Sequence, residues 1–79
     1  AEELHIIPAS YQIADALKLS GTKVLMKAGG QLKTVKEEIK KSGAQAVMVE
    51  NCGMPDEKVY YTLEEIPETA GYYSLLIVR

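Results

Sequence analysis

The chain has 79 residues, 47% of them hydrophobic and 25% charged, which is the composition of a folded domain rather than of a disordered tail. A chain of this length forms one domain at most and buries a modest share of its surface, about 60% near 60 residues. The net charge is −2 and acidic and basic residues alternate along the chain, which argues against a nucleic-acid interface, and no apolar run is long enough to cross a membrane.

The cysteine count and the first residue bear on where the protein works. Cys52 is the only cysteine and cannot form an internal disulfide, so we expect a reducing, cytoplasmic location. No secretory signal pattern is present. The chain begins with Ala1 rather than Met and soon enters an apolar stretch, so we expect it to be a piece of a longer protein.

The first twenty residues predict a strand and a helical turn. Residues 4–7 form a short apolar run that Pro8 ends, which is typical of a strand. Ser10 is a candidate N-cap for a helical turn that ends near residues 20–21. The apolar residues at helical spacing in this turn are Ile13, Ala14 and Leu17.

The next segment predicts a second strand and the main helix. Residues 24–26 form an apolar run that ends at Lys27. A helix is predicted from about residue 31 to residue 42, with charged side chains on one face. Its apolar stripe consists of Leu32, Val35 and Ile39. Gly43 stands where a left-handed C-cap belongs.

The second half of the chain predicts three more strands, at residues 44–50, 58–62 and 72–78. The last one is almost continuously apolar, so we expect it to be central in its sheet and buried on both faces. Thr62 and Glu65 have the spacing of a capping box, which predicts a short helical turn before Pro67. The expected fold is therefore a single small α/β domain with a mixed sheet of about five strands, one main helix and one or two short helices.

Groups that could carry out catalysis are few. His5 and Cys52 are the only histidine and cysteine, too few for a zinc site, and a Cys-His nucleophile pair would have to come from these two. Leu4 and Ile6 flank His5 in the first strand, so we expect the imidazole to point to the opposite, more polar face.

Two loops are candidates for ligand binding. Residues 27–34 pass from a strand through glycines into a helix, which can cradle a phosphate, but they match neither the P-loop nor the dinucleotide pattern, and a plain turn is the simpler interpretation. Residues 51–56 are longer than a tight hairpin turn and carry a thiol, a thioether and a proline. Small, soft side chains of this kind suit a flat apolar ligand, and a plain surface loop is the alternative.

Residues 50–57 carry a resemblance to a known family. They read Glu-Asn-Cys-Gly-Met-Pro-Asp-Glu, which is similar to a segment of precorrin-2 C(20)-methyltransferases in the tetrapyrrole methylase superfamily. Residues 4–10, 24–27 and 72–78 agree with the same family in order and spacing. Uroporphyrinogen methyltransferases share this frame, but they carry Pro-Glu-Gln-Arg where residues 55–58 read Pro-Asp-Glu-Lys.

The resemblance implies that residues 1–79 are the C-terminal domain of a two-domain methyltransferase whose N-terminal domain is absent from this chain. It implies S-adenosylmethionine as the methyl donor, held in the cleft between the domains together with precorrin-2 or cobalt-precorrin-2. The full-length enzyme is expected to be a homodimer and the isolated chain to be inactive. The resemblance implies no metal and no catalytic residue. The family's adenosine contacts fall here on Met26 or Lys27, on Cys52 with Gly53, and on Ser74 with Leu75.

Three other functions stay open at this point. The parent protein could be another tetrapyrrole methylase that acts at a different ring carbon, or a relative similar to diphthine synthase. From a different class, the chain could be a stand-alone regulatory module that binds a small ligand.

Overall fold

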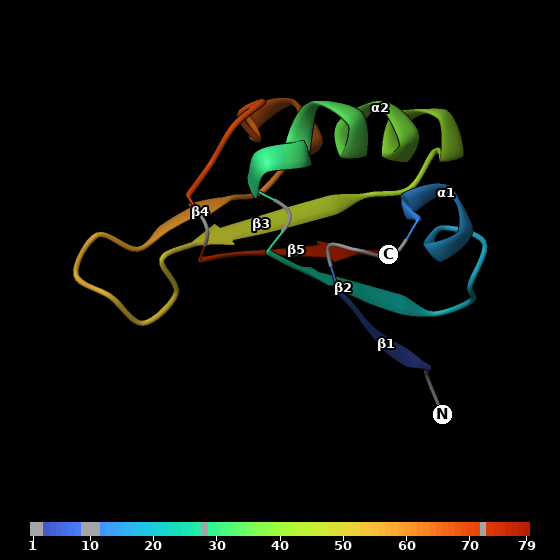
Figure 1. Cartoon of the computed structure of the whole chain (residues 1–79), viewed down its shortest axis with the longest axis horizontal. Helices are drawn as coiled ribbons and strands as arrows, with labels where there is room; N and C mark the ends of the chain where they lie inside the picture. Colours follow the sequence, from blue (N-terminus) through green and yellow to red (C-terminus); the bar gives the residue numbers. More distant parts are fainter. Residues whose placement is uncertain (1–2, 9–11, 28, 72) are drawn as a thin grey trace.

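The computed structural model of the chain describes residues 3–8, 12–27, 29–71 and 73–79. One five-stranded sheet forms a layer, and the helices lie against one of its faces (Figure 1). The strands are β1 (Leu4–Pro8), β2 (Thr22–Met26), β3 (Ala46–Glu50), β4 (Lys58–Tyr60) and β5 (Ser74–Val78). The helices are α1 (Ile13–Ala16) and α2 (Leu32–Ser42), with 3₁₀ turns η1 (Gly29–Gln31) and η2 (Leu63–Glu65). The α/β fold with one main helix is thereby confirmed.

The strand order is β1-β2-β5-β3-β4, so the last strand in the sequence lies in the middle of the sheet. The pair β1–β2 is parallel, and the other three pairs are antiparallel. The predicted central place of β5 is confirmed. Its burial alternates, because Leu76 and Val78 are buried while Leu75 and Ile77 are half-buried. The expectation that both faces of β5 are buried is wrong, since the described helices cover only one face.

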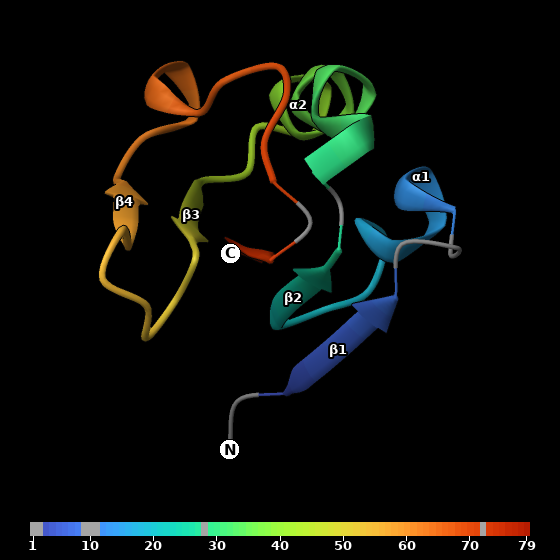
Figure 2. The same cartoon turned by 60° about the vertical axis from the view of Figure 1, so that its left-hand side comes forward.

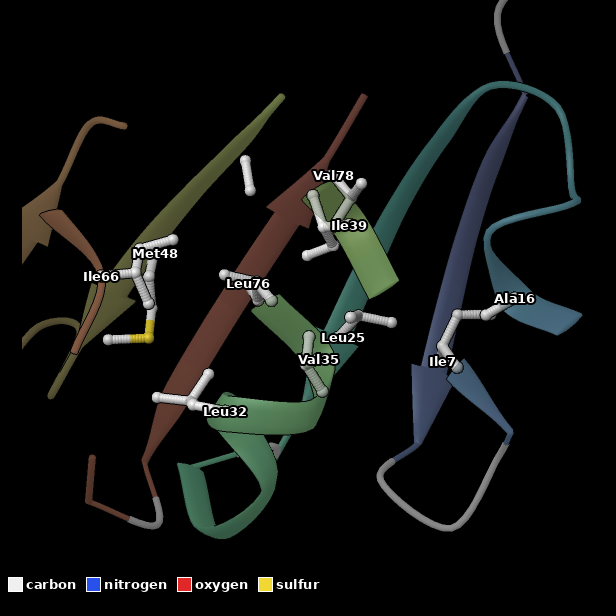
Figure 3. Close-up of a cluster of buried hydrophobic side chains, with 11 residues drawn as sticks. Ile7, Ala16, Leu25, Leu32, Val35, Ile39, Met48, Ile66, Leu76 and Val78 are labelled. Atoms are coloured by element: carbon white, nitrogen blue, oxygen red, sulfur yellow. The ribbon is translucent and has the colours of Figure 1, made fainter. Parts of the chain in front are cut away.

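The core lies between α2 and the sheet. The predicted stripe of Leu32, Val35 and Ile39 is buried and joins one cluster with Leu76 and Val78 (Figure 3). Burying each large aliphatic side chain contributes about 1.5–3 kcal/mol. The predicted helix end is also confirmed, because Gly43 has the left-handed φ of 76° and its backbone N–H bonds to carbonyls of the last turn.

The segment before β2 differs from the expectation. The helix covers only Ile13–Ala16, and Ala16 is the buried residue while Ala14 is exposed. Ala16 is buried because it faces Ile7, the buried residue of β1 (Figure 3). The proposed cap at Ser10 lies outside the described residues.

The start of β1 is tied to the turn that leads into β2. Ser20 Oγ donates a hydrogen bond of 2.6 Å to Glu3 Oε2, and His5 Nε2 lies 3.2 Å from the same oxygen. The Ser20 hydrogen bond, with a smaller effect of His5, lowers the pKa of the Glu3 carboxyl. Gly21 has φ of 82°, and a Cβ on it would lie 2.3 Å from the Glu3 carbonyl oxygen, so only glycine fits there. His5 does point away from Leu4 and Ile6, but the expectation that its side of β1 is the more polar face is wrong, because that side carries the buried Ile7 while Leu4 and Ile6 are exposed.

The second predicted cap joins η2 to the helical layer. Thr62 Oγ1 accepts from the Glu65 backbone N–H at 3.3 Å and lies 3.1 Å from Glu65 Oε1. Ile66 follows and is 1% exposed, and its carbonyl accepts from Lys36 Nζ on α2. Thr62 thus caps η2 as predicted, but the second half of the capping box differs, because the Glu65 carboxylate contacts the Thr62 hydroxyl and not the Thr62 backbone N–H.

The start of β1 and the end of β5 lie at the same end of the sheet. At the start of β2, Thr22 pairs with Leu4 of β1, and its neighbour Lys23 pairs with Val78 of β5. The loops that follow β2 and β3 leave the sheet at the opposite end (Figure 1).

We expect Leu76→Ala to lower the free energy of unfolding by about 2–5 kcal/mol, because it empties a buried site of the central strand. Leu4→Ala is the matched control, since Leu4 is 63% exposed and its loss should cost less than about 1 kcal/mol. Thermal and urea unfolding monitored by circular dichroism measure both. If the Leu76→Ala variant had the same melting temperature as the unchanged protein, the core would have to lie elsewhere.

Candidate functional site

Three chain segments that are far apart in sequence meet at one end of the sheet. Met26 at the end of β2 pairs with Leu75 in β5, and Glu50 at the end of β3 pairs with Ser74. The contacts continue beyond the strands, because Lys27 N donates to the Ser74 carbonyl at 3.3 Å and residue 51 donates its N–H to residue 73 at 2.7 Å. The antiparallel pairing of β5 with both neighbours thus places two strand ends beside one strand start.

The six residues predicted to bind the cofactor all lie on these segments, which is the site's main feature. Met26 is 37% exposed, and Lys27 is exposed. Cys52 and Gly53 are exposed in the loop between β3 and β4, which extends beyond the sheet (Figure 1). Their role in binding remains a prediction.

The side chains of Ser74 and Leu75 differ in burial and in the face of the sheet on which they lie. Ser74 is 4% exposed, and its hydroxyl donates to the Gly71 carbonyl at 3.2 Å. Leu75 is half-buried on the face of the sheet away from α2, beside Met26. Leu75 and Met26 therefore supply the apolar surface at this end of the sheet. The Ser74 side chain instead stabilises the preceding turn through its hydrogen bond to the Gly71 carbonyl.

Two residues at this end have unusual backbone geometry. Lys27 has φ of 60° and Asn51 has φ of 55°, and each follows directly after a strand. The left-handed region is uncommon for residues with a Cβ and costs about 1–2 kcal/mol, although asparagine tolerates it better than lysine. Such conformations cluster at ligand sites. Two of them on both sides of the start of β5 mark this end of the sheet as a candidate binding region.

The loop after β3 is held in shape by its own polar groups. Asn51 Nδ2 donates to Asp56 Oδ2 at 3.0 Å, and the Gly53 backbone N–H donates to Glu57 Oε1 at 2.8 Å. The Met54 backbone N–H donates to the Asn51 carbonyl at 2.9 Å. The Gly53 amide therefore already faces a carboxylate, which shows that it can bind an acceptor group.

The Glu50 carboxylate, at the end of β3, connects β4 to the segment before β5. Its Oε1 accepts from the Tyr60 hydroxyl at 3.2 Å, and its Oε2 accepts from the Gly71 backbone N–H at 3.0 Å. Neither this role nor that of Glu57 could be predicted from the sequence, since both depend on which backbone N–H groups the fold brings near. A carboxylate that is half-buried and hydrogen-bonded at both oxygens is a structural tie.

The chemistry available here is that of binding rather than of nucleophilic attack. His5 begins β1 and Cys52 follows β3, so the two lie at opposite ends of the sheet and do not form a catalytic pair. Within the described ranges, no group of three metal-binding side chains occurs, and no helix is long and apolar enough to span a membrane. What this end offers is the apolar side chains of Met26 and Leu75 and, in the loop after β3, the Gly53 backbone N–H, which donates to the exposed Glu57 carboxylate.

A groove of about 690 Å³ lies at the other end of the sheet, between the end of α2 and η2. Lys40, Gln45, Tyr61 and Arg79 are among its lining residues. None of the six predicted site residues lines it. The strand-end site is preferred as the candidate because it combines converging segments with two left-handed residues other than glycine, whereas the only left-handed residue described in the groove lining is Gly43, the C-cap of α2.

No protein-family model and no curated protein matches the sequence. Among solved structures, the fold is similar to that of cobalt precorrin-4 methyltransferase, CbiF, a cobalamin biosynthetic enzyme. The TM-score is 0.72 and the sequence identity is 18%, and the match covers 95% of this chain and 39% of that enzyme. The chain thus has the fold of part of that enzyme and spans well under half of its length.

We expect Lys27→Gly to raise the free energy of unfolding by about 0.5–1 kcal/mol, because glycine adopts a φ of 60° without a Cβ penalty. The same exchange at Lys33, an exposed position inside α2, is the control and should lower it by about 1 kcal/mol. Urea titrations of both variants measure whether the free energy of unfolding rises or falls. Equal losses at the two positions would show that Lys27 is not held in the left-handed region.

Proposed function

We propose that this chain is the C-terminal domain of an S-adenosylmethionine-dependent tetrapyrrole methyltransferase. One observation carries the proposal: three loops resembling the cofactor contacts of this family lie side by side at one end of the sheet. The fold shared with cobalt precorrin-4 methyltransferase supports it. We place the whole enzyme in the cytoplasm as a homodimer.

For the substrate, we propose precorrin-2 or cobalt-precorrin-2, methylated at carbon 20. The support is residues 50–57, whose Cys-Gly-Met-Pro run with an acidic pair resembles the enzymes that act at that carbon. Another tetrapyrrole methylase, with a different ring carbon as target, is the alternative within the same class.

The residues present fit an adenosine group. Met26 and Leu75 are paired neighbours and form an apolar surface suited to the purine ring, and the Gly53 backbone N–H, which donates to Glu57 Oε1, is the proposed donor to the adenine edge once a ligand replaces that carboxylate. When bound, S-adenosylmethionine supplies the methyl group and the leaving group. The chain's own part is to position the donor and to exclude water from one side of it, which needs neither a metal nor a nucleophile.

The alternative from another class is a stand-alone module that binds a small ligand. The exposed loop of residues 51–57 is compatible with it, because a preformed loop binds ligands in many folds. The two proposals differ in what else is required. The methyltransferase needs a second domain to close the cleft, whereas the module binds its ligand alone.

We expect the full-length protein containing this chain to transfer a methyl group from S-adenosylmethionine to carbon 20 of precorrin-2 or its cobalt form. Mass spectrometry and NMR of the product identify the carbon. The 79-residue chain alone should show no transfer and no micromolar binding of S-adenosylhomocysteine by calorimetry. Micromolar binding by the isolated chain would favour the stand-alone module, and methylation at a different carbon would correct the substrate.

In the full-length protein, Cys52→Ala should leave methyl transfer nearly unchanged, because the proposed contact depends on close approach and not on the thiol. Cys52→Leu should raise the KM for S-adenosylmethionine and lower kcat, since a displacement of about 1 Å can reduce a rate about 100-fold. Melting temperatures of both variants separate binding from folding. A stable but inactive Cys52→Ala enzyme would instead make the thiol a participant.

A further inference from the structure

The groove between the end of α2 and η2, which we call the edge groove, exists because β4 is shorter than β3. Met48 pairs with Tyr60, so Ala46 would pair with Thr62 if the ladder continued. However, β4 ends at Tyr60, and Thr62 caps η2. Figure 2 shows the chain turning from the end of β4 toward η2. Within the described residues, the start of β3 therefore has no neighbouring strand on its outer side.

The backbone groups of Ala46 face the edge groove. Gln45 and Arg79 exchange two backbone hydrogen bonds, with N···O distances of 3.3 and 2.9 Å. Since hydrogen bonding alternates along an antiparallel strand, the N–H and C=O of Ala46 point away from β5, to the outer side of β3. No hydrogen bond joins either group to another residue of the part of the chain that the structure describes. Ala46 is only 4% exposed, and a buried donor and acceptor without partners are uncommon in folded proteins.

Charged and apolar side chains line the groove around these two backbone groups. Lys40 and Arg79 contribute two positive charges and Glu64 contributes one negative charge, so the lining has a net charge of +1. The whole chain has a net charge of −2, so this excess of positive charge is local. Tyr61, 70% exposed, and the half-buried Leu63 add apolar surface. The lining therefore favours a ligand that combines apolar groups with a negative charge.

We infer that the edge groove binds a short, extended, acidic segment of a partner protein, which adds a strand beside β3. A peptide residue in an extended conformation offers an acceptor and a donor to the same neighbour, and these are the two groups that would pair with Ala46. A carboxylate or phosphate ion without an N–H could accept from Ala46 but could not donate to it. The groove volume of about 690 Å³ lies within the range of about 300–1,000 Å³ that is usual for ligand sites.

This inference does not depend on the methyltransferase proposal. The edge groove and the candidate cofactor site lie at opposite ends of the sheet, and none of the six predicted cofactor residues lines the groove. A partner segment bound here would leave the loop of residues 51–57 uncovered.

The probe is the blocked peptide acetyl-Val-Glu-Val-Glu-Val-amide, titrated into the nitrogen-15-labelled 79-residue chain and followed by NMR. We expect saturable binding with a Kd below about 1 mM. The backbone N–H signal of Ala46 should shift and its hydrogen exchange should slow, because the peptide carbonyl accepts from it. The same peptide with every backbone nitrogen methylated keeps both charges but offers no N–H, and it should bind at least about tenfold more weakly.

Lys40→Glu reverses one charge of the lining and should raise the peptide Kd on the order of tenfold. Arg79→Glu is a second variant with the same expected effect. Lys33→Glu is the matched control, because Lys33 is an equally exposed lysine of α2 that does not line the edge groove. All three positions are exposed, so the variants should fold, which circular dichroism checks.

Weaker binding in the Lys40→Glu and Arg79→Glu variants, with unchanged binding in Lys33→Glu and a shifted Ala46 signal, supports the inference. A Kd above about 1 mM for the unchanged chain overturns it. Equal binding of the methylated peptide also overturns it, as does full displacement of the peptide by an equal concentration of inorganic phosphate, because the groove then holds an anion without strand pairing. An Ala46 signal that does not move on saturation shows that the peptide uses another surface and equally contradicts the inference.

Discussion

Backbone pairing holds β5 between β2 and β3, and the other elements take their places relative to that strand. On one side of β5, Leu76 and Val78 supply the surface on which α2 packs. At its start, the same pairing brings the ends of β2 and β3 beside Ser74. Stability and the candidate site therefore depend on the same strand, so a substitution inside it affects both.

The loops of the candidate site gain their shape from polar contacts with backbone groups. Glu50 and Glu57 each accept from a backbone N–H, of Gly71 and Gly53 respectively. These contacts reduce the freedom of loops that would otherwise have to be ordered when a ligand binds, and preorganisation of this kind lowers the entropic cost of binding. The left-handed Asn51 belongs to the same arrangement, since it turns the chain sharply out of β3.

Periodic features were predictable from the sequence, and contacts between distant segments were not. The stripe of α2, its Gly43 cap and the central β5 follow from patterns that local geometry imposes. The identity of the buried residues in β1 and α1 was missed, because four or five residues carry too little periodicity to tell which face meets a helix. Resemblance to a family indicated which loops to compare, and their meeting at one end required the fold. The hydrogen bonds of Glu50 could not be predicted from any sequence pattern.

The start of β1 and the end of β5 lie at one end of the sheet, and the loop that carries Cys52 lies at the other. A molecule attached to a sensor surface through a tag on either end would therefore hold that loop away from the support, open to solution. The same arrangement favours a circular permutant. A short linker could join the old ends, and new ends could be opened in the exposed loop of residues 51–57 without cutting a strand of the sheet.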